Sequence, residues 1–195
     1  MEFFEDNLYH IYNRENNRQP IFFRPENYLF FLKKVKNHLL PHCDILAWCL
    51  MPNHFHFLAH TDKRSVLHKK LAGEERNVIS EGIRNLLSSY TQAINKQNKS
   101  TGSLFQQNTK AKLISNDSNF YGQTCFHYIH QNPMKAGLVK KMENWAYSSF
   151  SDYCTRRPDA FTNEELAVTL LGLNIQTFYE DSYKSINNSD LDNIL

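Results

Sequence analysis

Apolar side chains recur along the chain with two different periods, and the strand-like period comes first. Residues 7–13 alternate loosely between apolar and polar positions, and residues 44–51 form a continuous apolar run, so both segments are predicted to be strands. Pro52 and Asn53 are typical turn residues, and residues 54–60 are therefore expected to return as the second strand of a hairpin. The pattern predicts a single strand and, further along, a hairpin.

Helix-like spacing marks three longer segments. Residues 26–40 and 76–97 carry apolar side chains three and four positions apart, and Pro25 suits the first turn of the earlier helix. Asn-Asp-Ser at 116–118 is typical of a helix N-cap. The helix that follows is expected to stop at Pro133, because proline lacks the backbone N–H that a helix needs.

The order of these elements predicts the fold class. Strands are also predicted at 103–107 and 110–114, which makes the order strand, helix, hairpin, helix, strand, helix. This order is typical of an α+β fold with helices packed mainly on one face of an antiparallel sheet. We expect one domain over residues 1–157. Residues 158–195 are expected to form a C-terminal tail or small extension with a short helix at 162–171.

Composition and charge exclude some classes of protein but do not identify a binding partner. The 195 residues are 41% hydrophobic and carry a formal net charge of +2, so the whole-chain charge neither demands nor excludes nucleic acid. No apolar run reaches membrane-spanning length, and the acidic first ten residues lack the apolar region of a secretory signal. The cysteines form no CxxC pair, which favours reduced thiols in a cytoplasmic protein. They are Cys43, Cys49, Cys125 and Cys154.

Two histidines in the second hairpin strand are the first candidates for chemistry. Side chains alternate faces along a strand, so His54 and His56 point to one side, away from the phenylalanines between and after them. Neutral imidazole is a common ligand of divalent transition metals. Taken alone, such a pair is more often a pair of structural histidines. His60 has the same parity but lies further along, and we interpret it as structural.

A second candidate stretch lies on the helix that precedes Pro133. Tyr128 and Asn132 are four residues apart and share a helix face. A tyrosine hydroxyl can act as a nucleophile, and an amide oxygen can be a neutral metal ligand. Because Asn132 precedes a proline, helical geometry is disfavoured there, and Gln131 remains an alternative ligand.

Four motifs in this order resemble a known family. They are MPNHFHFL, LFQQNTKAKLI, YIHQNPMKAGLV and WAYSSFSDY, which begin at residues 51, 104, 128 and 145. Together they resemble the REP-associated tyrosine transposases, which are similar to the single-tyrosine transposases of the insertion-sequence 200/605 group within the HUH endonuclease superfamily. The resemblance covers residues 7–153. Many relatives have glycine where this chain has Glu15, after Asn13 and Arg14.

The resemblance implies a fold, a reaction and site residues. The fold would be a ferredoxin-like or RRM-like antiparallel sheet with the HUH strand at its centre. His54, His56 and Asn132 would bind a divalent metal, Mg²⁺ or Mn²⁺, and Tyr128 would be the nucleophile. The protein would be a transposase that cleaves and rejoins single-stranded DNA, at or near hairpins of palindromic repeats, through a 5′-phosphotyrosine intermediate.

Basic residues near the motifs are candidates for DNA contacts, although each alone is more often solvated surface. They are Arg14, Arg18, Lys110, Lys112, Lys135, Lys140 and Lys141. Such a protein would be cytoplasmic and associated with the nucleoid, as a monomer or a homodimer, with the monomer favoured because one chain can carry a complete site. The alternatives are a domesticated, non-catalytic regulator that binds DNA or RNA hairpins, and a metal-dependent phosphodiesterase.

Overall fold

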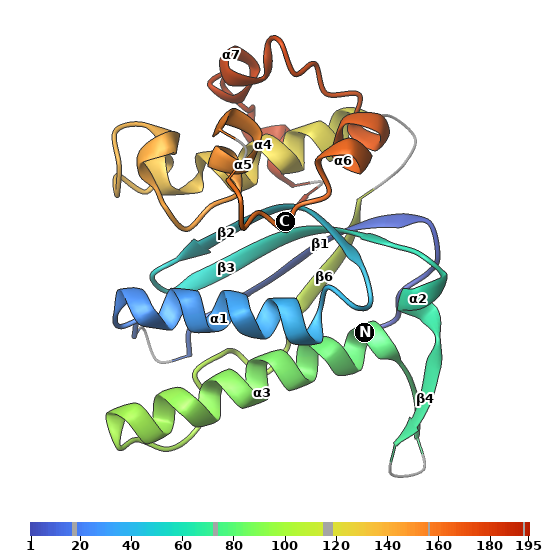
Figure 1. Ribbon diagram of the computed structural model, residues 1–195, viewed down its shortest axis with the longest axis vertical. Helices are drawn as coiled ribbons and strands as arrows, with labels where there is room; N and C mark the ends of the chain where they lie inside the picture. Colours follow the sequence, from blue (N-terminus) through green and yellow to red (C-terminus); the bar gives the residue numbers. More distant parts are fainter. Residues whose placement is uncertain (17–18, 72–73, 115–118, 156, 193) are drawn as a thin grey trace.

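An antiparallel sheet forms the centre of the computed structural model, which describes residues 1–16, 19–71, 74–114, 119–155, 157–192 and 194–195. Within these ranges the main sheet has four strands in the order β2-β3-β1-β6 (Figure 1). The strands are β1 (Asn7–Arg14), β2 (Asp44–Met51), β3 (His54–Thr61) and β6 (Lys110–Ile114). The predicted α+β class and the predicted first strand and hairpin are therefore confirmed.

The segment predicted as a strand at 103–107 does not form one. Phe105 makes a single antiparallel bridge with Glu15, and Leu104 and Phe105 are buried. These apolar side chains serve the core as part of a loop, and of the two segments predicted as strands here, it is 110–114, present as β6, that pairs with β1 along a ladder.

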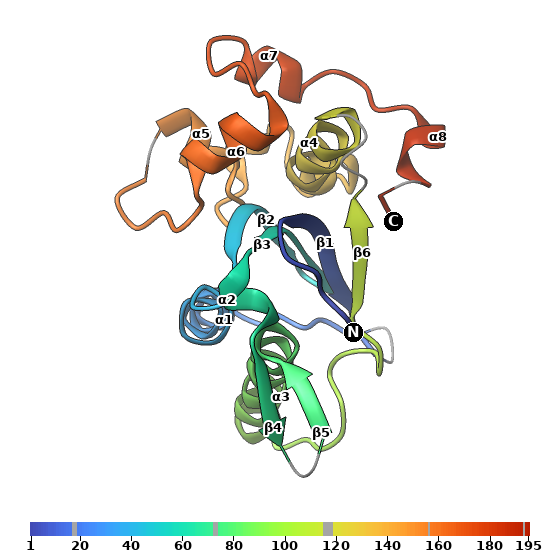
Figure 2. The same cartoon turned by 90° about the vertical axis from the view of Figure 1, so that its right-hand side faces the viewer.

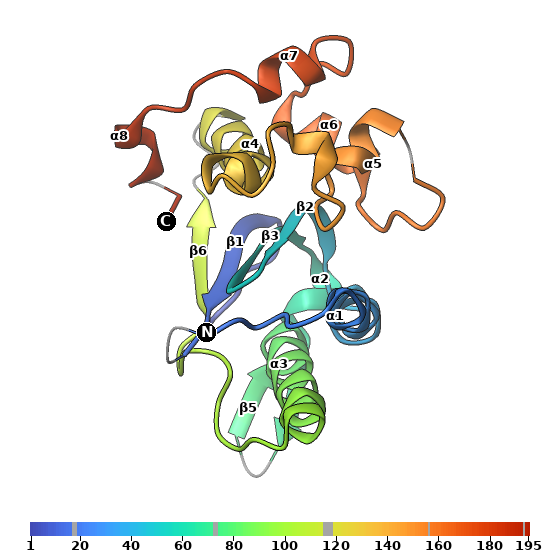
Figure 3. The ribbon, with the colours of Figure 1, turned by 90° about the vertical axis from the view of Figure 1, so that its left-hand side faces the viewer.

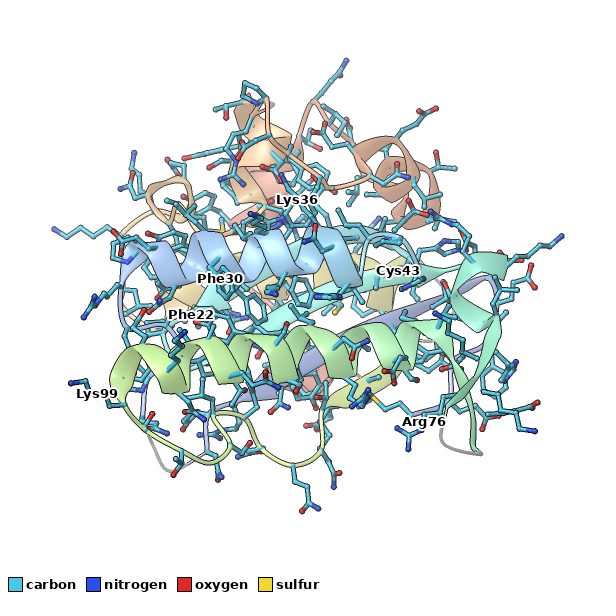
Figure 4. All side chains as sticks on the ribbon, turned by 60° about the horizontal axis from the view of Figure 1, so that its bottom comes forward. Phe22, Phe30, Lys36, Cys43, Arg76 and Lys99 are labelled. Atoms are coloured by element: carbon cyan, nitrogen blue, oxygen red, sulfur yellow. The ribbon has the colours of Figure 1, made fainter. Side chains whose placement is uncertain are left out.

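Two long helices cover one face of the sheet. They are α1 (Pro25–His38) and α3 (Val78–Asn98), close to the predicted segments 26–40 and 76–97. Figure 4 shows Phe22 and Phe30 between these helices, and both rings lie near the ring of Tyr90. Gly82 lets the helices approach closely, because a Cβ atom there would collide with the His38 carbonyl oxygen. The layer buries the phenylalanine face of β3.

Helices also cover the second face, which differs from the expectation that they lie mainly on one (Figures 1 and 3). They are α4 (Asn119–Lys135), the 3₁₀ helix η1 (Met142–Asn144), α5 (Phe150–Thr155), α6 (Glu164–Leu171), α7 (Phe178–Ser182) and α8 (Asn188–Leu191). The reason is that β2 is apolar on both faces and β3 adds Leu58 on the same side. Cys49, Met51 and Leu58 would be exposed to water without α4 and the segments that follow it.

The segment 158–195, expected to be a tail or small extension, packs onto this second layer. Leu171, Phe178 and Ile194 belong to the same apolar cluster as Phe126 of α4. The predicted helix at 162–171 is present as α6. The predicted N-cap at 116–118 lies outside the described residues. The C-terminal segment is thus part of the core on the α4 side of the sheet.

A second, smaller sheet was not foreseen from the sequence. The strands β4 (His68–Leu71) and β5 (Glu74–Asn77) form a hairpin that projects beside α3, after the short helix α2 (Lys63–Val66) (Figure 2). The sequence of this hairpin is rich in charged residues, so it lacks the alternation of apolar and polar residues that predicts a strand.

The structure can also be compared with the expectations about membrane spans and cysteines. Among the described residues, no helix is long and apolar enough to cross a bilayer. All four cysteines are free thiols; Cys43, Cys49 and Cys125 are buried, whereas Cys154 is exposed at the end of α5.

Candidate active site

His54 and His56 lie on β3, between β2 and β1, on the face covered by α4. Their ring centroids are 5.0 Å apart with the planes at 87°. The His54 Nδ1 atom is hydrogen-bonded to Asn53 Oδ1 at 2.7 Å. The two rings are therefore adjacent and nearly perpendicular, and the Nε2 atom of His54 takes no part in the bond to Asn53.

His56 shows the feature expected of a metal ligand. Its side chain is 4% exposed, and its Nε2 atom is buried without a hydrogen-bond partner in the described part of the chain. Burial lowers the pKa of His56 well below its ordinary value, so the ring is neutral. A neutral, buried and unpartnered imidazole nitrogen is costly unless something binds it. These two histidines therefore fit a divalent cation.

Tyr128 lies over the same face. It is on α4, which packs against β2 and β3. Its ring centroid is 5.7 Å from that of His56 and 6.1 Å from that of His10, both edge-on. Burial raises the pKa of Tyr128, and a hydrogen bond with the Asn132 side chain offsets part of that rise. Its hydroxyl is protonated at neutral pH.

Helix α4 does not stop at Pro133, as the sequence predicted, but continues to Lys135. Asn132 therefore keeps its place one turn after Tyr128, and its Nδ2 atom donates to the Tyr128 carbonyl oxygen at 2.9 Å. The carbonyl oxygen of Pro133 itself accepts from Leu138, which closes the helix end. Packing of α4 on the sheet compensates for the local preference against helix before a proline.

Gln131, the alternative ligand, points elsewhere. Its Nε2 atom donates to the carbonyl oxygens of Ser182 and Lys184, at 2.8 and 2.9 Å. It fastens the C-terminal segment to α4 and is not directed at the histidines. Within the described ranges, no group of three or more His, Cys, Asp or Glu side chains is placed to hold a metal.

The proposed DNA-contacting residues divide into three groups. Arg14 pairs with His54 in register, and Lys110 pairs with Tyr12, so both exposed side chains lie at the edge of the site. Lys112 is occupied, because its amine donates to the carbonyl oxygens of Asp192 and Leu195. The remaining described residues are exposed at or beyond the end of α4; they are Lys135, Lys140 and Lys141. Arg18 lies outside the described residues.

Sequence reasoning did not select His10 as part of the site. It is fully buried on β1, its Nε2 atom lies 2.8 Å from His56 Nδ1, and its Nδ1 atom lies 2.5 Å from the Ile194 carbonyl oxygen. The signal was its parity, which puts it on the same strand face as Leu8 and Tyr12. What the sequence could not show was the register that sets β1 beside β3. His60, interpreted as structural, forms no part of this cluster.

Comparison with known proteins places the fold. No family model matches the chain, and no curated protein does. The structure of a REP-associated tyrosine transposase bound to a REP hairpin aligns with a TM-score of 0.57, over 80% of this chain and 84% of that chain, at 19% sequence identity. At this identity the likeness shows a shared fold, in agreement with the antiparallel sheet that the resemblance implied.

Proposed function

We propose that this protein is a transposase that cleaves and rejoins single-stranded DNA at or near hairpins through a 5′-phosphotyrosine on Tyr128. One observation carries the proposal: a buried, unpartnered histidine nitrogen, a second histidine and a tyrosine meet on one face of the sheet. The fold shared with a transposase that was bound to a hairpin supports it.

Tyr128 performs the substitution at phosphorus. Its Oη atom attacks the scissile phosphate, the bond from Oη to phosphorus forms, and the bond from phosphorus to the 3′-oxygen breaks. The phenol proton passes to solvent, and the departing oxygen takes up a proton to become a 3′-hydroxyl. Because a phosphodiester is kept in the link to Tyr128, a second 3′-hydroxyl can reverse the step and rejoin DNA without another energy source.

His54 and His56 would hold the cation through their Nε2 atoms, and Asn132 would complete the set. When bound, Mg²⁺ or Mn²⁺ supplies Lewis-acid stabilisation of the charge on phosphate oxygens. The chain itself positions the nucleophile: Tyr128 is half-buried on α4 over β3, and Asn132, one turn later, donates its Nδ2 hydrogen to the Tyr128 carbonyl oxygen. Arg14 and Lys110 are placed to contact the flanking phosphates.

The test is formation of a covalent adduct. We expect the full chain, incubated with labelled hairpin-flanked single-stranded DNA and Mn²⁺, to form a protein–DNA adduct that survives denaturing electrophoresis. Tyr128→Phe should abolish the adduct and leave hairpin binding unchanged. Tyr121→Phe, on the same helix two turns earlier, is the matched control and should keep the adduct.

The other outcomes separate the competing functions. Hairpin binding without an adduct, across a broad panel of single-stranded substrates, would indicate the non-catalytic regulator. Cleavage that persists in Tyr128→Phe would indicate a phosphodiesterase that uses water. His56→Ala should abolish cleavage and spare hairpin binding; loss of both would assign His56 a purely structural role.

The proposed working unit is a monomer. All of the proposed groups come from one chain, with Tyr128 already packed over its own β3. Size-exclusion chromatography with light scattering, with and without hairpin DNA, is expected to give one chain per particle.

A further inference from the structure

We propose that His10 is a positioning residue, which relays a hydrogen bond from the Ile194 carbonyl to His56 and so leaves the Nε2 atom of His56 free for a divalent cation. The inference deepens the proposed function and rests on it for the role of the metal. It concerns two residues 184 positions apart in sequence, His10 and Ile194.

The relay begins at the Ile194 carbonyl oxygen, which can only accept a hydrogen bond. The Ile194 carbonyl oxygen has no proton to give, so the His10 Nδ1 atom, 2.5 Å away, must carry the hydrogen. Both partners of the His10 ring are uncharged groups, a carbonyl and an imidazole, and the ring is fully buried, which favours the neutral form. Its Nε2 atom is then an acceptor.

The same reasoning applies to the ring of His56. The His56 Nδ1 atom lies 2.8 Å from His10 Nε2, and since Nε2 accepts, Nδ1 must donate. A neutral His56 that is protonated on Nδ1 has an unprotonated Nε2 atom. That atom is the one buried without a partner. One backbone carbonyl therefore determines which nitrogen of His56 carries the lone pair for a ligand.

The C-terminal segment holds that carbonyl in place. Ile194 is fully buried in the apolar cluster of the second layer, and Lys112 of β6 donates to the carbonyl oxygens of Asp192 and Leu195, at 2.5 and 2.7 Å. Figure 2 shows α8 and the C-terminus beside β6 and α4. In the register of the sheet, Lys112 lies directly opposite His10. The segment is thus tied to the strand that neighbours His10.

The arrangement has the form of a metal site with an orienting partner behind the ligand. Histidine ligands commonly donate their second ring N–H to an acceptor that sets the ring orientation and its protonated nitrogen. Here the acceptor is itself a histidine, which is oriented in turn by the backbone. Tyr12 packs against both imidazoles, with its ring centroid 4.7 Å from His10 and 5.7 Å from His56.

The first experiment needs no metal and no DNA. Long-range ¹H–¹⁵N correlation spectra of the metal-free full chain at neutral pH distinguish a protonated Nδ1 from a protonated Nε2 in each histidine. We expect His56 and His10 both to be protonated on Nδ1. A His56 ring protonated on Nε2 in the wild-type chain would overturn the proposal, whatever any variant does.

Substitution of His10 then tests the relay. His10→Phe keeps a ring in the same space but offers no acceptor, so His56 should shift toward the form protonated on Nε2. His10→Gln offers an amide oxygen as acceptor and an N–H for Ile194, so it should restore the wild-type form. Tyr12→Phe, which keeps the ring that packs on both imidazoles, is the matched control and should leave the spectrum of His56 unchanged.

Metal affinity gives a second readout, measured with Mn²⁺ alone by titration followed by electron paramagnetic resonance. We expect His10→Phe to weaken Mn²⁺ binding by roughly 10- to 100-fold, as is typical for partners behind a ligand, and His10→Gln to recover most of it. Unchanged Mn²⁺ affinity in His10→Phe would overturn the role of His10. If the wild-type chain bound no Mn²⁺ while His10→Phe still shifted the His56 tautomer, the relay would stand and the metal assignment of the proposed function would fail.

Discussion

Tyr128 and Asn132 stay on one face of α4 although a proline follows directly, because the helix continues to Lys135. Asn132 bonds back to Tyr128, whereas Gln131 bonds to the carbonyl oxygens of Ser182 and Lys184. Neighbours in sequence thus have different partners: Asn132 bonds within its own helix, and Gln131 bonds to the C-terminal segment.

Alanine substitutions at these two positions should have different effects, one on cleavage and one on stability. Asn132→Ala should reduce cleavage by roughly 10- to 100-fold, because it removes the proposed third metal ligand, one helical turn after Tyr128. Gln131→Ala should lower the free energy of unfolding by about 1–3 kcal/mol, because two carbonyl groups lose their donor, and should leave cleavage per folded molecule unchanged. Adduct assays and urea titrations of both variants measure these effects; equal losses of cleavage would contradict the assignment.

At the scale of elements, hydrogen bonds join β2 to residues 147–149, which follow α4 and η1 in the sequence. The Trp48 amide donates to Ser149 Oγ, and the Leu50 amide donates to the Tyr147 carbonyl oxygen. Beside this contact, Arg157 donates to Asp152 and to the Ser148 carbonyl oxygen. Asp152 is fully buried in α5, so its charge depends on that one arginine partner and on Thr162.

Removing the arginine should destabilise this layer strongly. Arg157→Met is expected to lower the free energy of unfolding by about 3–5 kcal/mol, because it leaves the Asp152 carboxylate buried without its cation. Burial already raises the pKa of Asp152 despite the arginine. The double variant Asp152→Asn with Arg157→Met should regain much of the loss, since no charge is left buried. Urea denaturation tests both; a loss in Arg157→Met similar to that of the double variant would show that the pair acts by packing alone.

At the scale of the molecule, the sheet is enclosed by two helical layers, and the layer on the α4 side buries several histidines. Burial lowers the pKa of His10, His54 and His127 to about 4. In the unfolded chain each would titrate near about 6.5. The folded state therefore binds fewer protons than the unfolded state between these values.

Stability should accordingly fall on acidification. It should be fully present above about pH 6.5 and decrease as the pH drops toward 4, with each such histidine contributing up to about 1.4 kcal/mol per pH unit within this window. His127→Gln removes one titrating group that contacts Ser182, away from the proposed metal ligands, and should flatten the curve. Urea titrations from pH 4.5 to 7 measure the slope; an identical slope in the variant would contradict the depressed pKa of His127.

The sequence by itself determined the features that depend on local period. Alternation placed His54 and His56 on one face of a strand, and helical spacing placed Tyr128 and Asn132 on one face of a helix. The order of elements was enough for the α+β class and the antiparallel sheet. These features follow from the repeat geometry of strands and helices, which does not depend on contacts with distant segments.

Only the tertiary structure decided how distant segments meet. It brought His10 to His56 through the register of β1 and β3, closed the second face with α4 and the C-terminal helices, and engaged Lys112 with the chain end. It also kept α4 helical through Pro133, against the local preference. Each of these outcomes depends on contacts between residues far apart in sequence, whose packing energy outweighs local propensity and leaves no periodic trace along the chain.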